Sequence, residues 1–312
     1  MVREVARGPS APHAVAVVVG SALYGGITVG GRFFANMGFS LLEIAIAGGL
    51  FGALLVLPVI VWRPDLRPAR RDLMFFVGFG VMGTVLQISQ FLGIVLGVPV
   101  AIVALLLYTQ PVWTVLLGRL LLAEPITRQK IAALALASVG ILLLVGPTDS
   151  QDPYSLLGLV AAAVAGLGIS LWVILARMSA LRGVHAVTTT FTYQASTTVG
   201  LLVVGAGLAV ALPGNDMWTI EASTFALNWQ PVLIYAVTAN LIPALLVMWG
   251  MKALEASIAG VLLLLEPVAA AGLAWAMFGE AITGNIWLGG GFILAANAVL
   301  VLRRPQQQIA AD

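Results

Sequence analysis

Residues 262–283 read LLLLEPVAAAGLAWAMFGEAIT, an apolar run of helix length that carries Glu266 and Pro267 near its start. A related stretch lies 156 residues earlier, LLYTQPVWTVLLGRLLLAEPIT at 106–127, and eight of the 22 aligned positions are identical. The shared positions include the proline, a later glutamate and the Ile-Thr pair close behind it. The chain is therefore predicted to contain an internal repeat.

The composition around these stretches indicates a membrane protein. Of the 312 residues, 61% are hydrophobic and 9% are charged, and the mean hydropathy is +1.05, whereas soluble domains carry roughly 25% charged residues. About 20 apolar residues span a bilayer as a helix, and the runs lack the alternation of barrel strands. The first run continues beyond Gly30 and is interpreted as a retained helix rather than a signal peptide. Ten transmembrane helices are predicted, at roughly 13–34, 38–62, 72–96, 98–122, 128–146, 154–179, 184–212, 229–251, 255–279 and 283–302.

With ten helices, each repeat holds five, and an odd number places the two halves in opposite orientations. The seven Lys and Arg residues of two connections in the first half have no Lys or Arg at the corresponding positions of the second. We expect an all-α integral membrane protein built from two inverted-topology five-helix repeats around a central cavity. This architecture is typical of secondary transporters, although a duplicated structural protein stays an alternative. The predicted parts are a cytoplasmic tail (1–12), the two repeats (13–147 and 148–303) and a second cytoplasmic tail (304–312).

The distribution of charge predicts the orientation. If the N-terminus is inside, 14 of the 15 Lys and Arg residues fall on the cytoplasmic side, and only Arg32 lies near the outer face. The connections 147–153 and 213–228, which are then outside, carry acids and no cations. Both termini are therefore expected in the cytoplasm.

The paired motifs AEPIT (123–127) and GEAIT (279–283), together with ten helices and a five-helix inverted repeat, resemble the drug/metabolite transporter superfamily of the EamA type. Within it, the aromatic and neutral amino-acid exporters of the YddG kind look most similar. The resemblance covers nearly the whole chain. It implies export of small metabolites from the bacterial cytoplasm, across the inner membrane, through a central cavity. Many members carry an arginine near the middle of the second helix, where this chain has Glu43, so arginine-based carboxylate recognition there is in doubt.

Two acidic residues stand out inside the predicted helices. Glu266 lies near the middle of the ninth helix, where a charged side chain is costly. It is a candidate for binding a substrate ammonium or for carrying a coupled proton. The structural alternative is a hydrogen bond to the carbonyl freed by Pro267, or to Gln110 in the fourth helix. Glu43 is a second candidate for proton coupling, or it reaches the interface or pairs with Arg32.

Aromatic and amide side chains within spans complete the predicted site. Gln87 and Gln90 share one helix face, which suits a cavity lining or interhelical hydrogen bonds. Trp172 follows Gly168 by one turn and is either a packed knob or the wall of a pocket. The candidates for substrate binding are Tyr24, Gln87, Gln90, Phe91, Tyr108, Trp172, Asn240 and Glu266, and helix bends are expected at Pro111, Pro243 and Pro267.

Several functions are disfavoured by the sequence. There is no cysteine, and the two histidines lie away from carboxylate pairs, so neither a metal site nor a cofactor is expected. The segment GFGVMG (78–83) follows no strand and lacks the acid of a dinucleotide site. It is interpreted as a helix-packing surface, like the G-x-x-x-G segments at 26–30, 48–52 and 93–97. The sequence contains no P-loop, so ATP is not expected to bind. The basic residues lie in short connections between the predicted helices, which does not suggest a nucleic-acid-binding surface.

The sequence thus predicts a secondary transporter that exports neutral aromatic or hydrophobic amino acids by alternating access, with a small metabolite and membrane lipid as its partners. A cationic drug or a nucleotide derivative is the alternative substrate. A membrane enzyme or a structural protein is the alternative class. Enzymatic chemistry would need a His/Asp or multi-acid cluster at the interface, and the sequence offers none.

Overall fold

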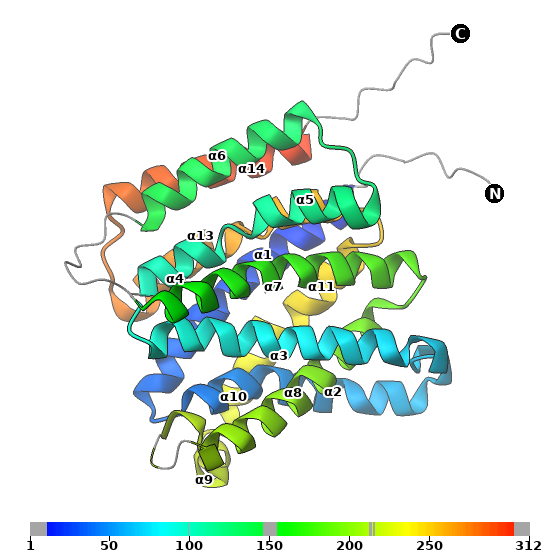
Figure 1. Cartoon of the computed structure of the whole chain (residues 1–312), viewed down its shortest axis with the longest axis vertical. Helices are drawn as coiled ribbons and strands as arrows, with labels where there is room; N and C mark the ends of the chain where they lie inside the picture. The colour runs from blue at the N-terminus through cyan, green and yellow to red at the C-terminus, as the bar shows by residue number, and fades with distance from the viewer. Residues whose placement is uncertain (1–10, 99, 146–154, 212–213, 215, 303–312) are drawn as a thin grey trace.

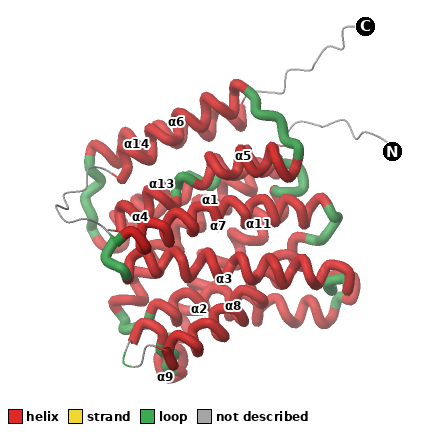
Figure 2. The backbone as a smooth tube through the Cα atoms, in the orientation of Figure 1, coloured by secondary structure: helices red, strands yellow, loops and turns green. Residues whose placement is uncertain are grey.

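The computed structural model describes residues 11–98, 100–145, 155–211, 214 and 216–302, and every regular element in these ranges is helical (Figures 1 and 2). Most of the two predicted tails and the predicted outer connection 147–153 lie outside the described residues. The α-helices are α1 (Ala11–Asn36), α2 (Leu41–Trp62), α3 (Leu73–Val95), α4 (Val100–Leu107), α5 (Gln110–Leu122), α6 (Arg128–Val145), α7 (Leu156–Leu181), α8 (Ala186–Ala211), α9 (Ala222–Leu227), α10 (Trp229–Tyr235), α11 (Ile242–Gly250), α12 (Ala256–Leu262), α13 (Leu265–Phe278) and α14 (Gly284–Leu302). Short 3-10 turns occur at η1 (Pro64–Leu66), η2 (Arg70–Asp72) and η3 (Asp216–Trp218), and η4 (Ala236–Leu241) is π-helical.

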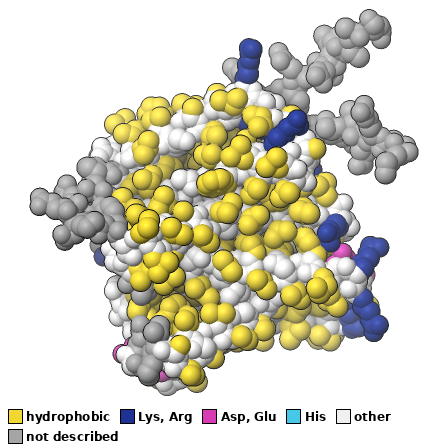
Figure 3. Space-filling model, in the orientation of Figure 1, with side chains coloured by type: hydrophobic (Ala, Val, Ile, Leu, Met, Phe, Trp, Pro, Cys, Tyr) yellow, Lys and Arg dark blue, Asp and Glu magenta, His cyan; other side chains and the backbone are white. Residues whose placement is uncertain are grey.

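Ten segments in the described part of the chain are long and apolar enough to cross a membrane. Seven of these segments each correspond to one α-helix, namely α1, α2, α3, α6, α7, α8 and α14. The other three each combine two α-helices: α4 with α5, α10 with α11, and α12 with α13. This confirms the predicted all-helical fold with ten candidate transmembrane helices. Figure 3 shows hydrophobic side chains over the middle of the visible face and most Lys and Arg side chains towards one edge.

Three of these spans are interrupted within their length. The fourth breaks after Leu107 and the ninth after Leu262, and Pro111 and Pro267 lie in the first turn of the helix that follows each break. Proline is tolerated there because first-turn N–H groups have no intrahelical partner. The eighth span passes through η4, and Pro243 opens α11 behind it. The three prolines predicted at bends therefore stand where a new helical segment begins.

The helices of the two halves interleave. α6 packs along α14, α1 packs on α13 and α11, and α7 packs on α3 and on α4 with α5 (Figure 1). In the predicted repeat, α7 is the counterpart of α1, α4 with α5 is the counterpart of the span that holds α13, and α3 is the counterpart of the span that holds α11. The α1–α13 contact therefore corresponds to the contact of α7 with α4 and α5, and the α1–α11 contact corresponds to the α7–α3 contact. This pairing fits two structurally related halves.

Glycines allow the closest approaches, as the G-x-x-x-G segments predict. A methyl group at Gly48 would lie 2.2 Å from the Asn240 side chain, and one at Gly52 would lie 2.5 Å from the Gln194 amide oxygen. Each amide therefore fills the space that a side chain on α2 would occupy. The expectation is wrong for Gly97, which has a φ of +80° beyond the end of α3 and no neighbour within 4 Å.

Candidate functional site

The two helix breaks are held in place by serine hydroxyls from the helices that cross them. Proline at position 267 leaves the Leu263 carbonyl without its usual helical donor. The hydroxyl of Ser21, on α1, donates to that carbonyl at 2.9 Å. On the other half, the hydroxyl of Ser170, on α7, donates to the Gln110 carbonyl at 2.8 Å. α5 also packs against α12, so both breaks belong to one central region of the bundle.

Glu266 lies in the first turn of α13 and is half-buried. Its carboxyl makes no hydrogen bond or ion pair within the described residues. Both partners considered for it from the sequence are engaged elsewhere. The Leu263 carbonyl accepts from Ser21, and Gln110 donates to the Gly260 carbonyl at 2.6 Å while its own oxygen accepts from Thr114. In the described residues, neither of the two structural partners considered for Glu266 forms a hydrogen bond with its carboxyl.

Two tyrosines lie near Glu266. They are Tyr24, on α1, and Tyr108, at the break between α4 and α5, and both are close enough to feel the charge of its carboxylate. The Tyr24 ring meets the Trp172 ring edge-on, with centroids 6.2 Å apart, and Trp172 lies 6.1 Å from Tyr193 of α8. The structure thus brings together four residues predicted from the sequence. Tyr193 was missed, although its threonine-rich surroundings, TTTFTYQASTT at 188–198, are unusually polar for a membrane helix.

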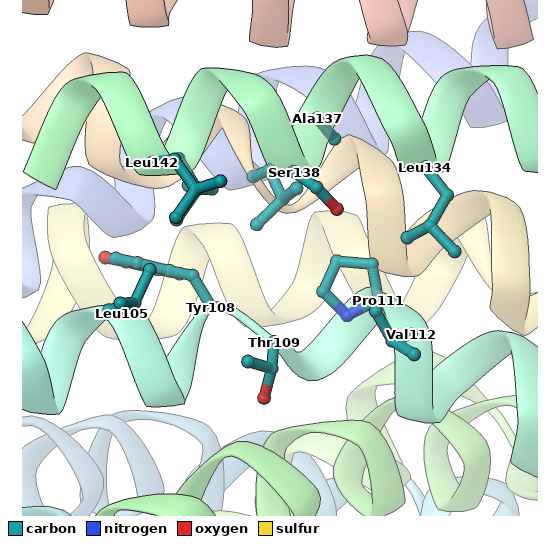
Figure 4. A pocket seen from close by; sticks show the side chains of 11 residues that line it. Leu105, Tyr108, Thr109, Pro111, Val112, Leu134, Ala137, Ser138 and Leu142 are labelled. Atoms are coloured by element: carbon teal, nitrogen blue, oxygen red, sulfur yellow. The ribbon is translucent and has the colours of Figure 1, made fainter.

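A cavity of about 160 Å³ touches both helix breaks. Figure 4 shows Tyr108, Thr109 and Pro111 on one side and residues of α6 on the other, and Leu264 from the second break completes the wall. Small-molecule sites usually measure roughly 300–1,000 Å³, so this cavity is smaller than the usual site of a whole metabolite. Among the described residues, no group of three or more His, Asp or Glu is placed to hold a metal ion. Of the residues predicted to bind substrate, Tyr108 lines this cavity, whereas Glu266, Tyr24 and Trp172 are not among its lining residues.

The other predicted binding residues lie elsewhere. Gln87, Gln90 and Phe91 are half-buried on α3, which packs mainly against α7 and α8. Neither glutamine makes an interhelical hydrogen bond in the described part of the chain. Asn240 sits in the π-helical segment, and its amide lies 3.5 Å from the Tyr235 carbonyl. The structure gives none of these four a contact with Glu266.

Glu43 is a buried helix cap. Its carboxylate accepts the backbone N–H groups of Ser40 at 2.8 Å and of Glu221 at 2.7 Å, and the Ser40 hydroxyl accepts the Glu43 N–H. Both oxygens are therefore used to begin α2 and to fix the connection that leads to α9. The expected pair with Arg32 is wrong, because Arg32 is paired with Glu280.

A second buried carboxylate closes one end of the bundle. Glu124 follows α5 and accepts the N–H of Ala256 at 2.6 Å and both the N–H and the hydroxyl of Ser257, at 3.0 and 2.5 Å. Lys130 is buried beside it, 3.9 Å from the Glu124 carboxylate, and also pairs with Glu255. The N-terminus of α12 is thus capped by a residue of the other half. This network of Glu124, Lys130, Glu255, Ala256 and Ser257 is called the α12 lock below.

Comparison with known proteins agrees with this architecture. The model of the EamA-like transporter family matches residues 12–146 and 156–302. An uncharacterized transporter of Archaeoglobus fulgidus is 28% identical over 283 residues, which are 90% of this chain and 93% of that protein. A solved crystal structure covers 93% of this chain and 96% of its own with a TM-score of 0.72, and at 18% identity this similarity shows the fold alone. Since the two family matches span nearly all of the ten-helix bundle, the chain belongs to the EamA-like transporter family and is a multi-pass membrane transporter.

Proposed function

We propose that this transporter exports neutral amino acids with aromatic or other hydrophobic side chains, and similar small metabolites, from the cytoplasm. The observation that carries the proposal is the Glu266 carboxyl, which lies half-buried at a helix break, near two phenols and without a hydrogen-bond partner among the described residues. Ionisable groups inside a membrane usually serve transport or proton movement. Glu266 would bind the substrate ammonium and carry a proton when the substrate is absent.

The rest of a zwitterionic substrate also finds suitable groups. No side chain caps the N-terminus of α5 in the central region, and the positive end of a helix dipole suits a substrate carboxylate. The rings of Tyr24, Trp172 and Tyr193 offer dispersion to a hydrophobic side chain and cation–π attraction to an ammonium. An amino acid held between Glu266 and α5 would use both ends of its backbone.

The transport cycle would be alternating access by two inverted halves, residues 13–147 and 148–303. The exchange symmetry of the helix contacts supports this cycle. We place both termini in the cytoplasm and the protein in a bacterial inner membrane. The arginine-rich connections of the first half support that orientation.

A cationic drug is the second candidate substrate. An unpaired carboxyl beside aromatic rings also suits a cation that has no carboxylate. A phosphorylated metabolite fits less well, because a phosphate would need a Lys or Arg partner at the site. In the described residues, no Lys or Arg forms an ion pair with Glu266.

Replacing Glu266 with Gln should lower gradient-driven flux of labelled phenylalanine by about tenfold or more, since a charge-assisted hydrogen bond of about 1.5–3 kcal/mol is lost. Glutamine has a similar shape and its amide oxygen still accepts a hydrogen bond from an ammonium, but it cannot carry a proton. Exchange of substrate, which needs no net proton movement, should therefore fall less than gradient-driven flux. The measurement is efflux from proteoliposomes with and without a pH gradient. Flux that survives the substitution and ignores pH would show that Glu266 is not the coupling group. Flux of labelled organic cations, but of no amino acid, would favour the second candidate.

The aromatic wall predicts a substrate preference. Tyr193→Leu should reduce flux of phenylalanine about three- to tenfold more than flux of leucine, because a ring pair contributes about 0.5–1.5 kcal/mol beyond its buried area. Tyr235→Leu is the matched control, since Tyr235 packs on Phe34 in a separate cluster. Equal loss for both amino acids in the Tyr193 variant would remove this ring from the specificity site.

A further inference from the structure

A surface hollow of about 360 Å³ lies where α7 ends and α3 begins. Arg71, Asp72 and Arg182 line it. Arg182 is the residue that caps the C-terminus of α7, and Asp72 immediately precedes α3. The hollow therefore lies at a helix end, outside the region of Glu266.

The guanidinium groups of Arg71 and Arg182 have N–H donors that the Asp72 carboxylate does not use. Asp72 is buried, and its carboxylate lies 3.6 Å from Nη1 of Arg182 and 3.8 Å from Nε of Arg71. Both distances exceed those of a hydrogen bond. One carboxylate against two arginines leaves a net positive charge. The Arg182 guanidinium is also fixed 4.2 Å above the Phe75 ring, so its planar fork is held in position for a bidentate anion such as a phosphate.

Neighbouring arginines are used differently. Arg63 makes two hydrogen bonds of 3.0 Å to Asp65. Arg67 donates to the carbonyls of Ile60 and Val61 at the end of α2, at 3.3 and 2.6 Å. These two guanidinium groups serve the local backbone and its connection. The arginines of the hollow do not.

The residues that adjoin the lining residues in sequence are apolar and exposed. They are Leu73, Met74 and Leu181, and Met74 is 81% exposed. In a membrane transporter such side chains face acyl chains, so the hollow lies where the apolar surface meets a charged end of the bundle. We propose that it binds the phosphate headgroup of an anionic phospholipid, whose acyl chains lie over Leu73, Met74 and Leu181. This site is separate from the substrate site and does not rest on the proposed substrate.

The test compares retention of phosphatidylglycerol and phosphatidylcholine by the detergent-purified full chain, measured by native mass spectrometry. Wild type should retain phosphatidylglycerol preferentially. Arg71→Gln and Arg182→Gln should each weaken this binding by about tenfold, as expected for loss of a charge-assisted hydrogen bond. Arg182→Lys keeps the charge but loses the fork, and should fall between wild type and Arg182→Gln.

Arg63→Gln is the matched control, because it removes the same charge from the connection that holds Arg71, while the Arg63 guanidinium is already held by Asp65. It should change retention by less than about twofold, as expected for an exposed pair of small energy. An equal loss in this control would show that general charge attracts the lipid, and would overturn the site. Displacement of the lipid by millimolar inorganic phosphate alone would assign the hollow to a soluble anion instead. Thermal melting in phosphatidylcholine checks that the variants are folded.

Discussion

Replacing Glu124 with Ala is expected to lower the free energy of unfolding by about 3–5 kcal/mol, the cost typical of breaking a buried charged network from one side. The substitution removes the acceptor of three hydrogen bonds of the α12 lock. The N–H groups of Ala256 and Ser257 lose their partners at a helix N-terminus, and Glu255 at its cap position provides no side-chain hydrogen bond to replace them. Lys130, itself buried, also loses one of its two carboxylates. Denaturant unfolding in detergent micelles measures the loss.

The repeat provides the control. Glu280 occupies the position that corresponds to Glu124, but it forms an exposed pair with Arg32. Exposed pairs contribute about 0–1 kcal/mol, so Glu280→Ala should change stability little. Similar losses in the two variants would contradict the idea that burial gives the α12 lock its strength.

The same lock should also control access from its end of the bundle. The natural chain has no cysteine, so a single Cys at the buried Ala259 of α12 reports opening. Its labelling by a thiol reagent should be faster with Glu124→Ala than with the wild-type glutamate, because α12 is no longer tied to the other half. Unchanged labelling would make the lock purely a stabilising contact.

The sequence was sufficient to predict the ten spans, because ten apolar runs of membrane length leave few other ways to arrange the helices. It also indicated the breaks of the fourth and ninth spans, since the proline in the first turn after one break recurs 156 residues away after the other. The hydrogen bonds that stabilise the breaks could not be predicted. Ser21 and Leu263 are 242 residues apart, and their contact depends on how α1 crosses the ninth span, which no local pattern encodes.

The candidate site was predicted in part for the same reason. An intramembrane acid is conspicuous, so Glu266 was identified, and Tyr24, Tyr108 and Trp172 converge near it. Tyr193 was overlooked because its role depends on the face of α8 that packs on α3. Glu43 is an acid of a predicted span as well, and the sequence could not show that its carboxylate accepts two backbone N–H groups.

Gly25→Ala is expected to abolish most transport and to destabilise the protein by about 1–3 kcal/mol, the usual cost of overpacking. A methyl group at Gly25 would lie 2.7 Å from the Ala270 nitrogen and 2.9 Å from the Glu266 carbonyl oxygen. These are backbone atoms of α13, which cannot rotate away as a flexible side chain can. α1 and α13 must therefore separate, which moves Tyr24 relative to the Glu266 carboxyl. Flux in proteoliposomes and unfolding in detergent measure the two effects.

Gly31→Ala on the same helix separates this effect from a general change in helix propensity. A methyl group there would meet only the Ile44 side chain, at 3.9 Å, an ordinary contact. Alanine in place of an unstrained helical glycine stabilises by about 0.5–1 kcal/mol, so this variant should be slightly more stable and should keep its flux. If the two substitutions, six residues apart, change the free energy of unfolding in opposite directions, the close approach of α1 to α13 requires a residue without a side chain at position 25. If Gly25→Ala were as stable and as active as Gly31→Ala, the contact between α1 and α13 would not be what positions Glu266.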